Sequence, residues 1–142
     1  MNEEKRILAV DPGEKRIGIA VSDPTLTIAS PLTIIKHQSL LIDAAQIGQT
    51  AVDKNAIAII IGQASGSDGE ETPSSRHAQR LAEAIRRQVQ IPVILWDESG
   101  STQAARQAKI ELGARRSKRS GHFDEYAAVV ILQSYLDERC IK

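Results

Sequence analysis

The sequence has very little cysteine and few aromatic residues, and its charges cancel. Cys140 is the only cysteine among 142 residues, which excludes an intrachain disulfide and a zinc cluster built on several thiolates. Aromatic residues make up 3% of the chain, so a platform that stacks unpaired bases on aromatic rings is not expected. Eighteen basic and eighteen acidic residues give a formal net charge of zero, which argues against coating nucleic acid or an anionic membrane by bulk charge.

The sequence also lacks a long apolar run. No stretch approaches the roughly 18 apolar residues of a membrane-spanning helix, and residues 1–6 have no apolar core of the kind that a signal peptide needs. Together with the single cysteine, this predicts a soluble cytoplasmic protein without a membrane partner. Hydrophobic residues make up 42% of the chain, enough for one domain, residues 1–142, with a full core.

Three consecutive strands are predicted near the start of the chain. The apolar run from Ile7 ends in Asp11-Pro12-Gly13, a turn signal because proline presets φ and glycine accepts positive φ. A second β-rich run covers residues 16–22. A third, residues 25–35, contains Pro31 and therefore suits an edge strand. We expect an antiparallel meander, with Asp11 placed where the first, buried strand ends.

Helices and buried strands alternate through the rest of the chain. Helical spacing of apolar residues predicts helices over 40–55, capped by Ser39, and over 76–90, capped by Ser74 or Ser75. The apolar runs 56–61 and 91–96 predict buried strands, and a parallel arrangement is the natural one. Further helices are expected after Ser101 or Thr102, ending at Leu112, and over 124–139, with a basic loop at 114–121 between them. The pattern predicts an α/β fold with a mixed sheet covered by helices.

Acidic residues fall where sites form in such sheets, beyond the strand ends. Asp11 ends the first strand, Asp97 and Glu98 end the last, and Asp124 opens the final helix. Converging carboxylates repel one another unless cations neutralise them. Oxygen ligands without a cysteine or histidine cluster favour Mg²⁺ or Mn²⁺ over zinc. Two such ions would activate a water and stabilise the leaving oxygen in phosphodiester hydrolysis.

Each of these acids also has a purely structural interpretation. Asp11 could be a turn-forming residue and Asp124 a helix N-cap. Strand alternation points Asp97 and Glu98 in opposite directions, so one of them is expected to be a solvated surface acid. The isolated His122 is more typical of a loop histidine than of a zinc ligand. Four other acids are interpreted as turn or surface residues: Asp23, Asp43, Asp53 and Asp68.

Positive charge gathers beside two of the candidate acids. Lys15 and Arg16 follow Asp11, with Glu14 offsetting one charge. Four more basic residues shortly precede Asp124, namely Arg115, Arg116, Lys118 and Arg119. Such a run is usually a solvated loop, but phosphate contacts of this kind also position a nucleic-acid backbone without reading its sequence. A basic rim around an acidic centre is the charge pattern that a nuclease needs.

These motifs resemble the YqgF/RuvX family of RNase H-like nucleases, described both as Holliday junction resolvases and as nucleases that mature the precursor of 16S ribosomal RNA. The resemblance spans nearly the whole chain. Its motifs are Asp11-Pro12-Gly13 with residues 16–23, Ala29-Ser30-Pro31-Leu32, Gly62 with Asp68-Gly69, Asp97-Glu98 with Thr102 and Ala105, and Asp124 with Ala127-Ala128 and residues 131–136. The opening hairpin and the closing helix together are the most specific part.

The resemblance implies an RNase H-like mixed sheet of strand order 3-2-1-4-5. It also implies a divalent-metal-dependent endonuclease in which Asp11, Glu98 and Asp124 are the catalytic acids and bind Mg²⁺ or Mn²⁺. The implied partner is structured RNA or branched DNA, with pre-16S rRNA processing as the leading role and Holliday junction resolution as the alternative. The chain is expected to be a monomer or a homodimer. Symmetric cutting of two strands needs two active sites, so a monomer would favour RNA maturation.

Two motifs depart from the family's usual pattern and leave another alternative open. Gln63-Ala64 stands where the family has Leu-Pro, and Ser99 where it has an arginine. One charge-stabilising donor contributes roughly 3 kcal/mol at a transition state, so a nucleic-acid-binding module with impaired catalysis is a further reading. Phosphate transfer of the actin or sugar-kinase type is disfavoured, because one domain leaves no interdomain cleft for ATP.

Overall fold

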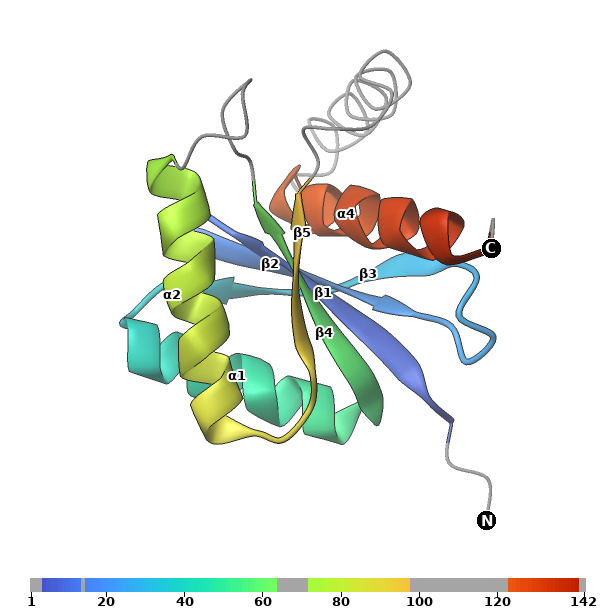
Figure 1. Cartoon of the computed structure of the whole chain (residues 1–142), viewed down its shortest axis with the longest axis horizontal. Coiled ribbons are helices and arrows are strands. Elements are labelled where there is room, and N and C mark those ends of the chain that lie inside the picture. Colours follow the sequence, from blue (N-terminus) through green and yellow to red (C-terminus); the bar gives the residue numbers. More distant parts are fainter. Residues whose placement is uncertain (1–3, 14, 64–71, 98–122, 141–142) are drawn as a thin grey trace.

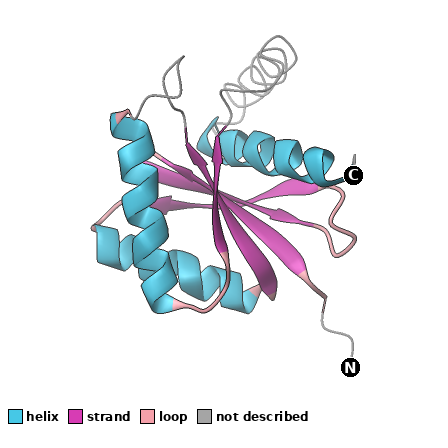
Figure 2. Ribbon diagram, in the orientation of Figure 1, coloured by secondary structure: helices cyan, strands magenta, loops and turns pink. Residues whose placement is uncertain are grey.

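The computed structural model is a mixed five-stranded sheet with helices on both faces (Figures 1 and 2). It describes residues 4–13, 15–63, 72–97 and 123–140. The elements are β1 (Arg6–Pro12), β2 (Arg16–Ser22), β3 (Ala29–Lys36), α1 (Leu40–Asp53), β4 (Ala56–Gln63), α2 (Pro73–Gln88), β5 (Val93–Asp97) and α4 (Phe123–Cys140). The expected helix ending at Leu112 and the basic loop after it lie outside the described residues.

The strand order is β3-β2-β1-β4-β5, which confirms the predicted topology. β1 pairs antiparallel with β2, and β2 with β3, as the two hairpin connections require. β4 pairs parallel with β1 and with β5, because α1 and α2 return the chain to the other end of the sheet before each new strand. β3, which contains Pro31, is an edge strand, where a missing backbone donor costs little.

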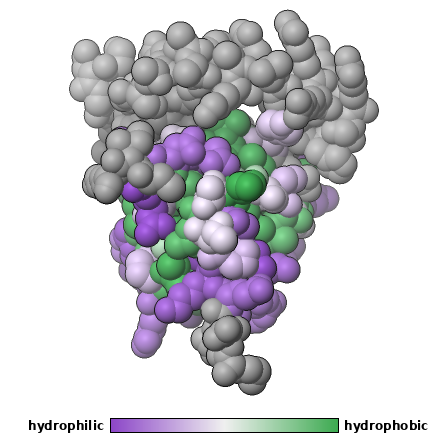
Figure 3. Space-filling model, turned by 90° about the vertical axis from the view of Figure 1, so that its right-hand side faces the viewer, coloured by the Kyte–Doolittle hydropathy of each residue, from purple (hydrophilic) through white to green (hydrophobic). Residues whose placement is uncertain are grey.

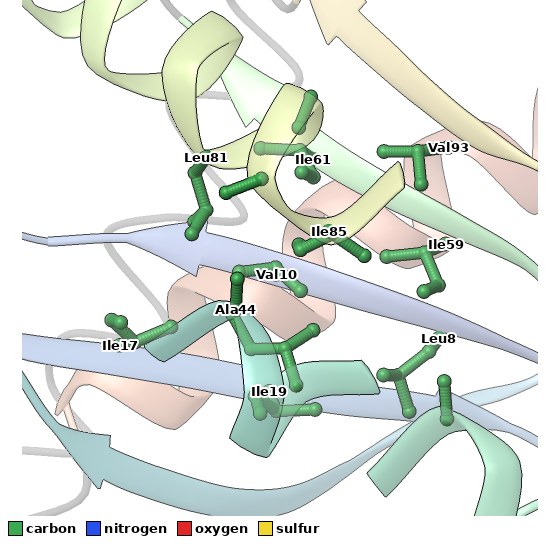
Figure 4. Close-up of a cluster of buried hydrophobic side chains, with 14 of the residues drawn as sticks. Leu8, Val10, Ile17, Ile19, Ala44, Ile59, Ile61, Leu81, Ile85 and Val93 are labelled. Atoms are coloured by element: carbon green, nitrogen blue, oxygen red, sulfur yellow. The ribbon is translucent and has the colours of Figure 1, made fainter. Parts of the chain in front are cut away.

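The central strands are apolar on both faces because each face carries a separate core. On one face, α1 and α2 cover a cluster that includes Leu8, Val10, Ile59 and Ile61 (Figure 4). On the other face, α4 covers a second cluster that includes Ile7, Ala9, Ile60 and Leu132. Successive residues of β1 and β4 therefore alternate between the two clusters, which explains the continuous apolar runs in the sequence.

The predicted N-cap of α1 is confirmed, and the predicted N-cap of α2 is wrong. Ser39 caps α1, and its hydroxyl accepts a hydrogen bond from the Ile42 N–H at 3.2 Å. α2 begins at Pro73 and is capped by Thr72, not by Ser74 or Ser75. Thr72 Oγ1 accepts from the Ser75 N–H at 3.0 Å, and Ser75 Oγ accepts from the Thr72 N–H at 2.8 Å. Proline needs no amide partner at the first helical position, so the helix starts earlier than the serines indicated.

The third strand begins at Ala29, four residues later than expected, because residues before it form a turn around Asp23. The Asp23 carboxylate accepts hydrogen bonds from the Thr27 and Ile28 N–H groups at 2.8 and 2.9 Å. Leu26 has a φ of 60°, outside the extended region. The prediction of Asp23 as a turn residue is confirmed, and Asp53 is exposed as expected. Asp68 lies outside the described residues.

The prediction of Asp43 as a turn or surface residue is wrong. Asp43 lies in the first turn of α1 and is 1% exposed. Its carboxylate contacts His37 Nδ1 and accepts a hydrogen bond from the Gln38 N–H at 3.0 Å, so both oxygens have partners. A buried carboxylate is tolerated when it is hydrogen-bonded in this way.

None of the described helices has the length and apolar character needed to cross a membrane.

Candidate active site

The parallel strands end at one edge of the sheet, and this edge carries the candidate site. β1, β4 and β5 end at Pro12, Gln63 and Asp97, with Val10 opposite Ile61 and Gln63 opposite Asp97 in the pairing. β1 has the antiparallel strand β2 on one side and the parallel strand β4 on the other. After β3 the chain crosses to the other side of β1 to form β4, so the strand order switches sides at β1. Ligands of open α/β sheets bind beyond the carboxyl ends of the strands at such a point.

Asp11 lies at this edge on the side of the sheet covered by α4. Ile7 and Ala9 pack in the α4 cluster, and strand alternation places Asp11 on the same face. Asp11 pairs with Gly18 of β2, which has no side chain to cover it. The aspartate is half-buried and belongs to the central strand of the sheet.

The turn after Asp11 is tight and depends on Gly13. The Gly13 N–H donates to the Asp11 carbonyl oxygen at 3.0 Å. A Cβ built on Gly13 would overlap the carbonyl oxygen of Arg16, so a larger residue would force the hairpin open. The glycine of the predicted turn is therefore required by a close approach of two backbone segments.

Cations follow at the same edge. Lys15 and Arg16 are exposed, as expected of residues that contact phosphate. Arg16 lies opposite Lys36 at the end of β3, and Lys36 is also exposed. The His37 N–H donates to the Lys15 carbonyl oxygen at 2.9 Å. This hydrogen bond connects the β1–β2 turn to the β3–α1 connection. Sequence reasoning missed Lys36, whose place beside Arg16 depends on the strand register.

His37 and Asp43 form a further contact of this region that the sequence did not reveal. The imidazole is held by the carboxylate of Asp43, which is itself buried in α1. The His37 backbone carries the hydrogen bond to Lys15. The buried carboxylate therefore orders, through His37 and Gln38, the segment to which the Lys15 turn is bonded. The available sequence signal was an aspartate in the first turn of a predicted helix, six residues after a histidine.

The backbone of α4 brings Asp124 to the same side of the sheet as Asp11. Asp124 is the second residue of α4, and Figure 1 shows this end of the helix where β4 and β5 end. Gly62 of β4 lies against Ile131, two turns further along α4. Trp96 of β5 donates from Nε1 to Ser134 Oγ at 3.3 Å and contacts Tyr135 edge-on, with ring centroids 5.2 Å apart.

The far part of α4 is attached to the β2–β3 connection, which fixes the helix across the sheet. Gln133 Oε1 accepts from the Ala29 N–H at 2.9 Å, and Gln133 Nε2 donates to the Thr27 carbonyl oxygen at 3.0 Å. Together with its packing on β1, β2, β3 and β4, these bonds hold α4 in place across the sheet.

The other predicted site residues are described only in part or not at all. Asp97 ends β5 and Asp124 lies in α4, but the described part of the structure does not include their side chains. Glu98 lies outside the described residues, as do Arg115, Arg116, Lys118 and Arg119. Among the described side chains, which include neither Glu98 nor Asp124, no three histidine, cysteine, aspartate or glutamate residues lie together as a metal site. The three-acid cluster stays a prediction.

Gln63 is an unusual feature of this edge. Its Oε1 atom is buried and has no hydrogen-bond partner, a condition shared within the described ranges only by His77 Nε2. An unpaired buried carbonyl oxygen costs about 1–3 kcal/mol. Gln63 is one of the two positions where the sequence departs from the Leu-Pro of the family it resembles.

Comparison with known proteins gives a match over nearly the whole chain. A family model described as "RuvX: Holliday junction resolvase" matches residues 5–138. The chain is 38% identical over 135 residues to a protein of Thermoanaerobacter pseudethanolicus named "Putative pre-16S rRNA nuclease", covering 94% of this chain and 97% of the relative. A relative of the same name from Roseiflexus sp. is 34% identical over 138 residues, with 97% and 98% covered.

Two solved structures share the fold at low sequence identity. The Thermus thermophilus RuvC in complex with a Holliday junction substrate aligns with a TM-score of 0.59 and 11% identity, covering 96% of both chains. The fowlpox virus Holliday junction resolvase aligns with a TM-score of 0.56 and 16% identity, covering 94% of this chain and 99% of the other. At these identities the comparison shows the fold alone.

Proposed function

The chain belongs to the RuvX family, and we propose that it is a divalent-metal-dependent endonuclease acting on structured nucleic acid, with the precursor of 16S rRNA as its substrate. The match over nearly full length to relatives named for that nuclease carries the proposal. The placement of Asp11 at the carboxyl end of the central strand supports it, since this is where sites form in open α/β sheets.

Asp11, Glu98 and Asp124 are the proposed ligands of Mg²⁺ or Mn²⁺. The donor set fits a hard cation because all of its atoms are carboxylate oxygens. Asp11 is on the α4 face, and α4 carries Asp124 in its first turn. Ile94 and Trp96 of β5 pack on the α4 face. Glu98, which directly follows β5 in the sequence, is the proposed third ligand because the resemblance of the Asp97-Glu98 motif implies it. A bound divalent ion would supply activation of the attacking water and stabilisation of the leaving oxygen.

The basic residues of this chain would hold the nucleic-acid backbone across the edge. Lys15 and Arg16 are exposed directly after the turn that follows Asp11. Lys36, opposite Arg16, adds a third cation to this side. Arg115, Arg116, Lys118 and Arg119, which shortly precede Asp124 in the sequence, are also proposed to contact phosphates. Contacts of this type set the position of the scissile bond without specifying sequence.

A cleavage panel tests the proposal. Purified protein is incubated with a structured pre-16S rRNA fragment and with a four-way DNA junction, in Mg²⁺, in Mn²⁺ and in EDTA. Metal-dependent cutting of the RNA fragment at defined positions supports the proposal. Absence of cutting of both substrates in either metal contradicts it.

The family description favours Holliday junction resolution as the second candidate. In the same panel, paired symmetric nicks in the junction and an intact RNA fragment would identify a resolvase. Such a resolvase needs two active sites, so sedimentation would then show a dimer. Salt-sensitive binding without cutting of either substrate would identify the impaired binding module that Ser99 and Gln63-Ala64 leave open.

A further inference from the structure

We propose that the groove between α1 and α2 binds the phosphate backbone of a double-stranded arm of the substrate, away from the bond that is cut. This inference rests on the proposed nuclease function and extends its substrate contact to a second face. The groove has a volume of about 460 Å³. It is lined by Leu40, Leu41, Arg76, Gln79, Arg80, Glu83, Ala84 and Arg87.

The arginines of the groove form one stripe along α2. With 3.6 residues per turn, positions 76, 80 and 87 fall within about 40° of one another, and the stripe is about 16 Å long. All three side chains are exposed. One strand of a duplex carries a charge at every phosphate, so a stripe of this length can contact several successive phosphates. The spacing suits a continuous phosphate backbone better than a single small anion.

Basic side chains outnumber acidic ones among the described residues that line the groove. Glu83 lines the groove, but its carboxylate pairs with Arg86, which is not a lining residue. Asp43 of the neighbouring helix is buried and engaged by His37 and Gln38. Among the described lining residues, the arginines therefore leave a net positive charge that faces solvent.

The groove begins at the same end of the sheet as the cations of the active edge. Leu40 begins α1 three residues after His37, whose N–H is bonded to the Lys15 carbonyl oxygen. α2 begins at the end of the sheet where β4 finishes, so Arg76 lies at the same end as the active edge. A duplex held by Lys15 and Arg16 can thus continue along the α2 stripe. Leu41, 66% exposed at the groove, offers an apolar surface for sugar carbons.

Figure 3 shows the side of the molecule that faces right in Figure 1, whereas α2 lies on the left in Figure 1. On the face shown in Figure 3, apolar and hydrophilic side chains of the described residues are interleaved. The charges of the chain cancel overall, so affinity for a polyanion must come from local gathering of cations. An acidic protein is the other class of partner that arginines attract, but the start of the groove at the same end of the sheet as Lys15 and Arg16 favours nucleic acid.

The test measures binding without cleavage. Fluorescence anisotropy of an unbroken 20-base-pair RNA duplex, and of the DNA duplex of the same sequence, is recorded in EDTA at several KCl concentrations. The variant is Arg80→Ala with Arg87→Ala. The matched control, Lys54→Ala with Arg139→Ala, removes two exposed cations outside the groove. The double variant Arg80→Lys with Arg87→Lys keeps the charges. Thermal melts confirm that all variants fold, as expected for exposed side chains.

The alanine variant is expected to bind duplex about tenfold more weakly than the control, and the slope of log K against log salt is expected to fall by about 1.8, or 0.9 per lost phosphate contact on DNA. The lysine variant should keep most of the affinity. Equal affinity and slope in the alanine variant and the control overturn the assignment, and this is also the result if the groove serves an acidic protein.

Failure of the proposed function gives a different result. Wild-type protein that binds duplex through Arg80 and Arg87 but never cuts contradicts the nuclease proposal and leaves the groove assignment standing. Wild-type protein that cuts, with Arg80 and Arg87 irrelevant to binding, does the reverse.

Discussion

Gly62, near the end of β4, lies directly against Ile131 of α4. A Cβ built on Gly62 would stand 2.9 Å from Ile131 Cγ1 and closer still to Cδ1. The contact is possible only because the strand has no side chain at this point. It sets how closely the helix that carries Asp124 approaches the edge that carries Asp11.

The first prediction follows from this contact. Gly62→Ala is expected to lower the free energy of unfolding by about 1–3 kcal/mol, because the added methyl group overpacks the interface. Chemical denaturation measures the effect. Adding Ile131→Val, which removes Cδ1, should recover part of the loss. Gly48→Ala is the control, since its Cβ would stand 3.1 Å from a movable Val89 methyl and alanine favours the helix. Simple additivity of the Gly62 and Ile131 changes would contradict the contact.

Gln63 provides the second prediction. Gln63→Leu is expected to raise the free energy of unfolding by about 1 kcal/mol, because the change removes a buried carbonyl oxygen without a partner and keeps a similar volume. Urea denaturation measures it, with Gln90→Leu on the exposed surface as a control for added hydrophobicity. A loss of stability in Gln63→Leu would mean that the amide is satisfied in solution.

The third prediction concerns the buried carboxylate of Asp43. Asp43→Ala is expected to cost about 1.5–3 kcal/mol, since hydrogen bonds to a charged group are lost and the Gln38 N–H loses its partner. The His37 amide, bonded to the Lys15 carbonyl oxygen, should exchange its hydrogen faster as the connection loosens. The exposed Asp53→Ala should change neither stability nor exchange appreciably. Unchanged exchange at His37 in Asp43→Ala would show that the carboxylate does not order this segment.

The fourth prediction is a pH dependence from the Asp23 turn. Hydrogen bonds from the Ile28 N–H, the Thr25 hydroxyl and the Thr27 N–H lower the pKa of Asp23 from 3.8 to about 2. A lowered pKa in the folded state stabilises the fold above 3.8, and this contribution is lost as the pH falls through about 2. The melting temperature of wild type minus that of Asp23→Asn should therefore be positive at pH 7 and shrink toward pH 2. A difference that does not vary with pH would exclude this role of the charge.

Much of the fold could be predicted because local and global signals agree in it. The two-sided apolar run of β4, Pro31 in an edge strand and the Ser39 cap each have one compatible place in a mixed sheet. The misses depend on contacts that local patterns do not contain. In the sequence Asp43 is an ordinary polar helix residue, and only the contact with His37 explains its burial. Thr72 caps α2 because Pro73 can occupy the first helical position.

In the candidate site, too, some residues were predictable from the sequence and others were not. Asp11 and its turn were predictable because Pro12 and Gly13 follow an apolar strand, and the structure places them as expected. Lys36 was not predictable, because its position beside Arg16 depends on the register between two strands. The α2 stripe was also missed, since arginines on a helix surface become a groove wall only when Leu40 and Leu41 pack alongside.

The fifth prediction addresses the central claim, that Asp11 binds the metal of a nuclease. The measurement is the rate of metal-dependent cleavage of a structured pre-16S rRNA fragment by wild type, by Asp11→Asn and by the exposed-surface control Asp53→Asn, all with matched thermal melts. The account predicts cutting by wild type and Asp53→Asn in Mg²⁺ or Mn²⁺, and a rate at background for Asp11→Asn with substrate binding retained. Cleavage by Asp11→Asn at the wild-type rate and with the same metal dependence would contradict it.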